Sequence, residues 1–152
     1  MNRDQYDAIL GDAIQGEIEA QNFYKAAAEK LRDPFLKDLF QGFVNEEKKH
    51  QDILEGFRSS MPETLPFDED RDFKVAETVD DTPELSTDMK PADAFSLAMK
   101  KEERAMKRYT DLAEGATDAE QKKIFQDLAA MERNHKRKME SAFVDVGYPE
   151  VW

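Results

Sequence analysis

The sequence predicts an all-α fold, a four-helix bundle made of two repeated helical hairpins joined by a long crossover. Three observations support this prediction. Apolar residues recur at helical spacing in four long segments. Glycine and proline are scarce, with six of each among 152 residues, and 37% of the residues are charged. Finally, an offset of 85 residues superimposes the second half of the chain on the first half without a gap. We expect one domain over residues 1–152.

The first hairpin is predicted to consist of helices at residues 4–31 and 34–58, separated by Asp33 and Pro34. One stripe of the first helix carries Leu10, Ala13, Glu17, Ala20, Tyr24, Ala28 and Leu31. The corresponding stripe of the second helix carries Leu36, Phe40, Phe43, Glu47, His50, Leu54 and Phe57. Polar residues therefore interrupt two faces that should be buried. The residues that fall off the second stripe are expected to face solvent, namely Glu46, Lys48, Lys49 and Asp52.

The helical periodicity fails over residues 59–90, which contain three prolines and a charged run at residues 68–72. A connection this long is uncommon in a compact domain, but a crossover of this kind joins the hairpins of some helical bundles. We therefore predict a crossover with a short helical turn near residues 73–77. The charged run is expected to be a solvated surface.

The second hairpin is predicted to consist of helices at residues 91–115 and 118–144. Asp88 is a candidate cap for the first of these, and residues 117–120 form a capping-box sequence before the second. The stripe of the first carries Phe95, Ala98, Glu102, Ala105, Tyr109, Leu112 and Ala116. That of the second carries Gln121, Phe125, Leu128, Glu132, His135, Met139 and Ala142. The aromatic tail at residues 148–152 is expected to fold back on the bundle or to fill a groove of a partner subunit.

Composition excludes several classes of function. A formal net charge of −12 disfavours nucleic-acid binding, because phosphates need a surplus of basic residues. The absence of cysteine excludes disulfides, thiolate catalysis and cysteine-ligated zinc or iron–sulfur sites. No apolar run approaches the roughly 18 residues that span a bilayer, and no apolar signal core follows Met1. We therefore expect a cytoplasmic protein with no membrane association.

The repeat identifies which polar residues point inward. It maps Glu17 onto Glu102, and it maps Tyr24 onto Tyr109. It also maps the pair Glu47 and His50 onto the pair Glu132 and His135, which contains the second of the only two histidines. Each of these histidines lies three residues after its glutamate, so both side chains of a pair share one helical face. Two of these glutamates have a glutamate beside them, and the repeat decides which of the two neighbours points inward. Glu46 would align with Met131 and Glu103 with Ile18, so the inward acids are Glu47 and Glu102.

Four carboxylates in one apolar core cannot all stay ionised unaided, because each loses hydration and they repel one another. No lysine or arginine lies on the four stripes at that level, whereas two imidazoles do. Imidazole and carboxylate are common ligands of iron, zinc and other divalent ions. We therefore predict a dinuclear metal site, in which two glutamates, Glu17 and Glu102, can bridge and each Glu-x-x-His pair can bind one ion.

This ligand pattern resembles that of the ferritin-like di-iron carboxylate proteins, in which such sites lie inside four-helix bundles. The Glu-x6-Tyr elements, Glu17 to Tyr24 and Glu102 to Tyr109, are most similar to the rubrerythrin branch. The resemblance covers about residues 5–144. It implies two iron ions as cofactor, with Glu17, Glu47, His50, Glu102, Glu132 and His135 as ligands. Tyr24 and Tyr109 are expected to donate hydrogen bonds to ligand carboxylates.

The resemblance further implies an oxidoreductase of oxidative-stress defence that reduces hydrogen peroxide, a peroxidase, with peroxide or dioxygen as its small-molecule oxidant. Typical rubrerythrins carry a cysteine-ligated rubredoxin domain, so this cysteine-free chain would need an external electron-donor protein. They also tend to have a further glutamate one turn after the third-helix ligand, where this chain has Ala105. A homodimer is expected by analogy.

Two other functions fit the same residues. One is iron oxidation for storage, a ferroxidase of the bacterioferritin-like type, although only about nine residues follow the fourth predicted helix and the fifth helix of those cages has no room. The other is a non-enzymatic bundle with a structural metal clasp. Manganese suits these ligands as well as iron does, and a dimanganese site would indicate a catalase-like reaction.

Overall fold

The computed structural model describes residues 2–62, 65 and 83–146, and it confirms the predicted all-α fold. Four helices form the bundle: α1 (Arg3–Lys30), α2 (Pro34–Ser59), α4 (Pro91–Gly115) and α5 (Ala119–Val146). Within the described residues, no helix is long and apolar enough to cross a membrane. The predicted turn near residues 73–77, the charged run at 68–72 and the tail at 148–152 lie outside the described residues.

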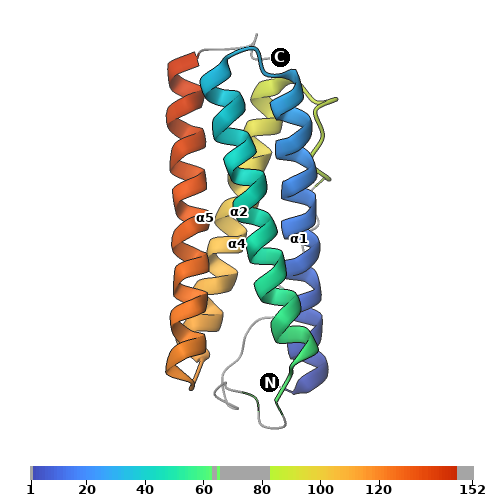
Figure 1. Ribbon diagram of the computed structural model, residues 1–152, viewed down its shortest axis with the longest axis vertical. Coiled ribbons are helices and arrows are strands. Elements are labelled where there is room, and N and C mark those ends of the chain that lie inside the picture. The colour runs from blue at the N-terminus through green and yellow to red at the C-terminus, as the bar shows by residue number, and fades with distance from the viewer. Residues whose placement is uncertain (1, 63–64, 66–82, 147–152) are drawn as a thin grey trace.

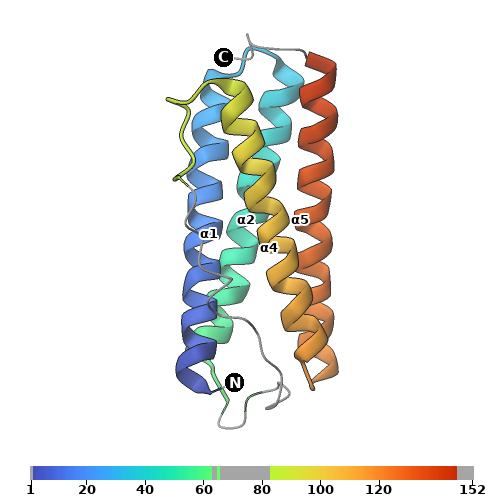
Figure 2. The same cartoon turned by 180° about the vertical axis from the view of Figure 1, so that it is seen from behind.

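The two hairpins lie side by side with their long axes nearly aligned (Figure 1). Helices α1 and α5 run in one direction, and α2 and α4 run in the opposite direction (Figures 1 and 2). Since α2 and α4 are parallel, the chain between them joins opposite ends of the bundle, as a crossover must. Each hairpin is packed most closely within itself, α1 against α2 and α4 against α5.

Local sequence signals explain where three of the helices begin. The Asn2 side chain accepts a hydrogen bond from the backbone N–H of Gln5, whose own side chain returns to the backbone of Asn2. Asp33 caps α2 through the backbone N–H of Phe35, with Pro34 in the first turn. The side chain of Asp118 accepts a hydrogen bond from the backbone N–H of Gln121 at the start of α5.

Two predicted caps are wrong. Helix α4 begins after Lys90, which makes no side-chain capping bond, so Asp88 does not cap it. Pro91 follows Lys90 and lacks an N–H, which removes one of the donors that a cap would otherwise satisfy. At α5 the capping residue is Asp118 rather than Thr117, because the helix begins one residue later than a cap at Thr117 requires.

All four predicted stripes face the interior, and their residues are buried or half-buried. The buried apolar residues form two clusters along the bundle. One contains Phe23, Phe40, Phe43 and Phe95, and the other contains Tyr6, Leu10, Leu54 and Phe125. Along α1 and α2, the buried polar residues fall between these two clusters. The fold thus places one polar layer between two apolar ones.

Substitution of Phe40 by alanine tests how much this packing stabilises the bundle. It lies 2% exposed with edge contacts to Tyr24 and Phe95, so Phe40→Ala leaves a cavity and should cost about 3–5 kcal/mol of unfolding free energy. Phe35→Ala is the matched control, because Phe35 is 71% exposed, and it should change stability by less than about 0.5 kcal/mol. Denaturant unfolding of both metal-free variants measures the difference. Equal midpoints for the two variants would contradict this packing.

Candidate metal centre

The six residues predicted as ligands meet in the middle of the bundle. Each helix contributes: α1 and α4 contribute one glutamate each, whereas α2 and α5 contribute a Glu-x-x-His pair each. None of the six side chains is more than 4% exposed: Glu17, Glu47, His50, Glu102, Glu132 and His135. The helical spacing explains this convergence, because each acid or imidazole replaces an apolar residue on a stripe that must face the core.

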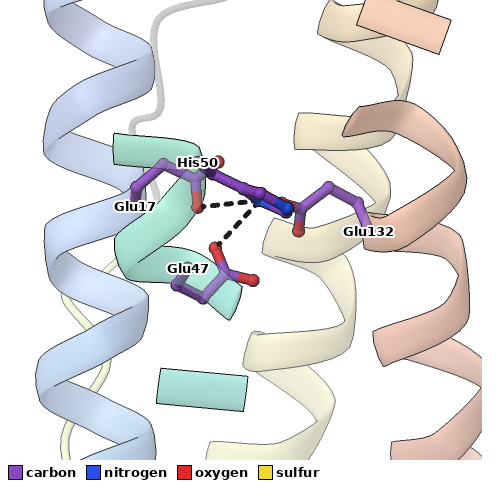
Figure 3. Close-up of side chains that lie close together, drawn as sticks. All are labelled: Glu17, Glu47, His50 and Glu132. Atoms are coloured by element: carbon purple, nitrogen blue, oxygen red, sulfur yellow. Dashed lines mark hydrogen bonds and ion pairs between the residues drawn. The ribbon is translucent and has the colours of Figure 1, made fainter. Parts of the chain in front are cut away.

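The six residues form two overlapping groups whose candidate ligand atoms lie within 4.8 Å of one another. One group contains Glu17, Glu47, His50 and Glu132, whose side chains converge from three helices (Figure 3). The other contains Glu47, Glu102, Glu132 and His135. The two groups share Glu47 and Glu132. The sequence predicts that Glu17 and Glu102 bridge the ions, and this geometry does not favour that assignment. Glu17 and Glu102 each belong to one group, and the glutamates of the two Glu-x-x-His pairs are placed to bridge.

Both histidines turn Nδ1 toward the carboxylates. The Nδ1 of His50 lies 2.8 Å from Glu132 Oε1, 3.6 Å from Glu17 Oε2 and 3.8 Å from Glu47 Oε2. The Nδ1 of His135 lies 2.7 Å from Glu47 Oε1 and 3.9 Å from Glu102 Oε1. The imidazole rings are nearly parallel, with an interplanar angle of 13° and centroids 6.2 Å apart. Each ring therefore presents the same nitrogen to the carboxylate layer.

The two tyrosines bond across the repeat. The hydroxyl of Tyr24 donates to Glu102 Oε1, and the hydroxyl of Tyr109 donates to Glu17 Oε1 at 2.5 Å. Burial, and then the charge of Glu102, raises the pKa of Tyr24 well above its usual value. Burial and the charges of Glu17 and Glu132 do the same to the pKa of Tyr109. Both phenols therefore remain protonated donors, which orients the two glutamates as the resemblance implied.

The protons in the cluster are unevenly shared. Burial, and then the charges of Glu102 and Glu17, raises the pKa of Glu132 well above its usual value. Burial also acts to raise the pKa of Glu102, but hydrogen bonding with Glu132 and His135 outweighs it, so that pKa is lowered. Burial lowers the pKa of His135, whereas the carboxylates of Glu102 and Glu46 outweigh burial and raise it. Without a metal ion, the raised pKa values of Glu132 and His135 favour the protonated forms of these two groups.

Several buried ligand atoms make no hydrogen bond, and this fits a metal site. They are Glu17 Oε2, Glu47 Oε1, Glu102 Oε2 and His135 Nδ1. His135 Nδ1 and Glu47 Oε1 are 2.7 Å apart, yet they are not aligned as donor and acceptor. Leaving such atoms unsatisfied costs about 1–3 kcal/mol each, and a bound cation removes that cost. Oxygen and imidazole nitrogen donors suit iron and manganese.

A cavity of about 390 Å³ reaches the cluster between α1 and α4. Small residues on the two helices make room for it, namely Ala13, Gly16, Ala20, Ala98 and Ala105. Toward the surface, Lys101 pairs with Glu19 at 2.6 Å and joins the two helices. Four glutamates of the cluster line the cavity, Glu17, Glu47, Glu102 and Glu132. The carboxylates are therefore reachable by a small molecule on the side of α1 and α4.

One residue at the site departs from the sequence prediction. Glu46 was expected to face solvent, but its side chain is only 32% exposed and its carboxylate accepts a hydrogen bond from Nε2 of His135. Periodicity placed Glu46 beside the buried stripe, where a side chain can reach the adjacent helix. No signal in a single helix could reveal that α5 would present His135 at that point.

Comparison with known proteins bears on the family and the fold of the chain. A family model for rubrerythrin matches residues 8–143. A hypothetical protein from Pyrococcus furiosus has 30% identity and a TM-score of 0.69, over 90% of this chain and 87% of that one. A Thermotoga maritima chain, assigned as a ferritin-like diiron-carboxylate protein, has 19% identity and a TM-score of 0.65, over 90% of this chain and 92% of that one. The second match bears on the fold alone. Among curated proteins, none matches the chain.

The retained protons predict how metal affinity depends on pH. Because the pKa values of Glu132 and His135 are raised, a metal ion must displace protons from the site. Affinity should therefore fall as the pH falls through these raised pKa values, and it should level off above them, where no proton remains to be displaced. Calorimetric titration with Mn²⁺ in two buffers of different ionisation enthalpy measures the protons released. Binding that releases no protons and does not vary with pH would contradict the assignment.

Proposed function

The chain belongs to the rubrerythrin family, and on that premise we propose that it is a di-iron oxidoreductase that reduces hydrogen peroxide. The observation that supports this most directly is the pair of buried ligand groups that share Glu47 and Glu132. Shared carboxylates are what a dinuclear site requires, because one acid must contact both ions. Two divalent ions would also balance the charge of four glutamates in an apolar core.

The residues of this chain would perform three tasks. Glu17, Glu47, His50, Glu102, Glu132 and His135 would hold the two ions. Tyr24 and Tyr109 would keep Glu102 and Glu17 in position by donating hydrogen bonds to them. The apolar clusters on either side would exclude water, while the cavity between α1 and α4 would admit the oxidant.

Two ferrous ions would each supply one electron, so that peroxide and two protons become two molecules of water. Because the 152 residues contain no cysteine, we propose that an external electron-donor protein returns the site to its reduced state. We also propose that the protein is a homodimer. Ala105 lines the cavity, and typical rubrerythrins tend to carry a further glutamate at this position. Because this chain lacks that glutamate, we propose that the same six ligands hold the ions in both redox states.

The proposal predicts a fast reaction of the iron-loaded protein with peroxide. Anaerobic loading with two equivalents of Fe²⁺, followed by stopped-flow mixing with hydrogen peroxide, should give rapid oxidation observed in the near-ultraviolet. The variant with Glu47→Ala and Glu132→Ala should lose this reaction, because it lacks both shared acids. Equal rates for the two proteins would contradict the proposal. A wild-type protein that melts on metal removal yet ignores peroxide when loaded would favour the structural clasp instead.

The proposed entry route can be tested at Gly16, which lines the cavity. A Cβ at this position meets no atom within 4 Å, so Gly16→Leu should fold and place its side chain at the cavity mouth. Oxidation by peroxide should slow several-fold at unchanged iron content. Gly42→Leu is the matched control, since Gly42 is also helical and unobstructed but does not line the cavity. If both variants react at the wild-type rate, the oxidant enters elsewhere.

A further inference from the structure

The two histidines differ in what their outer nitrogens contact. The Nε2 of His135 donates to the carboxylate of Glu46 on α2. The Nε2 of His50 faces the sulfur of Met131 on α5, at 3.3 Å. Positions 46 and 131 are equivalent in the repeat, just as His50 and His135 are. The same place in each half therefore holds an anionic acceptor on one side and a weak neutral acceptor on the other.

This difference stands out because much of the cluster obeys the repeat. The tyrosine–glutamate bonds are reciprocal, and the imidazole rings are nearly parallel with Nδ1 inward in both. Phe43 also packs against the ring of His135, at 4.5 Å between centroids, where the repeat gives Leu128 to the other half. That exchange is between apolar residues and changes no hydrogen bond. The exchange of Glu46 for Met131 changes the acceptor itself.

A carboxylate on the outer nitrogen of a ligating histidine has known consequences. It fixes the tautomer, so that Nε2 carries the proton and Nδ1 offers a lone pair to the metal. It also orients the ring and makes Nδ1 a stronger donor, and loss of such a partner typically weakens metal affinity about 10- to 100-fold. A thioether sulfur accepts a hydrogen bond only weakly and carries no charge. His50 thus lacks the support that His135 receives.

We propose that Glu46 is a positioning residue that makes the two metal positions unequal, so that the ion bound by the His135 group is held more tightly and fills first. This inference rests on the proposed function, in which the cluster holds two ions. It goes further by ordering their binding and by assigning the difference to one pair of positions, 46 and 131. The ion beside His50 is the one that is lost first.

Exchange of these two positions tests the proposal. Metal-free proteins are titrated anaerobically with Fe²⁺ against a chromophoric chelator, which gives the two binding constants. Wild-type protein should bind in two steps of different affinity. Glu46→Met should weaken the tighter step about 10- to 100-fold and bring the two constants together. Glu46→Gln should lie between, because its amide oxygen still accepts from Nε2 without a charge. Met131→Glu should tighten the weaker step.

Two controls separate this role from a general one. Asn134→Glu adds the same charge to an exposed position of α5, and it should leave both constants unchanged. Thermal unfolding of each metal-free variant reports any purely structural effect of Glu46. The inference is overturned if Glu46→Met leaves both constants at wild-type values, or if Met131→Glu tightens neither step. Wild-type protein that binds no iron, or that binds it no better than the Glu47→Ala, Glu132→Ala variant, would instead overturn the proposed function on which the inference rests.

Discussion

The burial of four carboxylates in the middle of an apolar bundle is the constraint on which the rest of this structure depends. Each of the four glutamates is at most 4% exposed, and ionised carboxylates in such a place must be paired, protonated or bound to cations. The chain uses the first two remedies in part. Two tyrosine hydroxyls and two imidazoles reach the cluster, and Glu132 retains a proton. Four buried ligand atoms still lack a hydrogen bond, which is the feature that most strongly indicates a metal.

The repeat turns this constraint into an architecture. Each hairpin packs closely within itself, and each supplies half of the polar layer. Neither half is sufficient, because the tyrosine of one hairpin bonds the glutamate of the other, and the Nδ1 of each histidine lies nearest to the glutamate of the opposite motif. The association of the hairpins and the assembly of the site are therefore the same event. A crossover between parallel α2 and α4 is what allows the two halves to face each other with this two-fold relation.

The sequence was sufficient for the fold class and for the inward face of every helix. Apolar periodicity located the stripes, and the repeat decided between Glu46 and Glu47 and between Glu102 and Glu103, because a two-fold site requires equivalent acids. The sharing of Glu47 and Glu132 escaped this reasoning, since a helical face specifies direction but not which side chains of other helices lie within reach. The same limit applies to Glu46, whose partner lies on α5. The caps at Asp88 and Thr117 were wrong because capping depends on where the backbone leaves the helix, to within one residue.

The departures from two-fold symmetry are where this chain can carry properties of its own. An ideal repeat would give two identical metal positions, and identical positions would bind, lose and reduce their ions alike. Two differences break that equality: a cavity that opens between α1 and α4, and unequal acceptors at positions 46 and 131. The cavity determines from which side a small molecule can reach the carboxylates, whereas the acceptors act on the histidines from the seam between α2 and α5. Because these features lie on different helix pairs, substitutions can alter access without altering the histidine donors, and the reverse also holds.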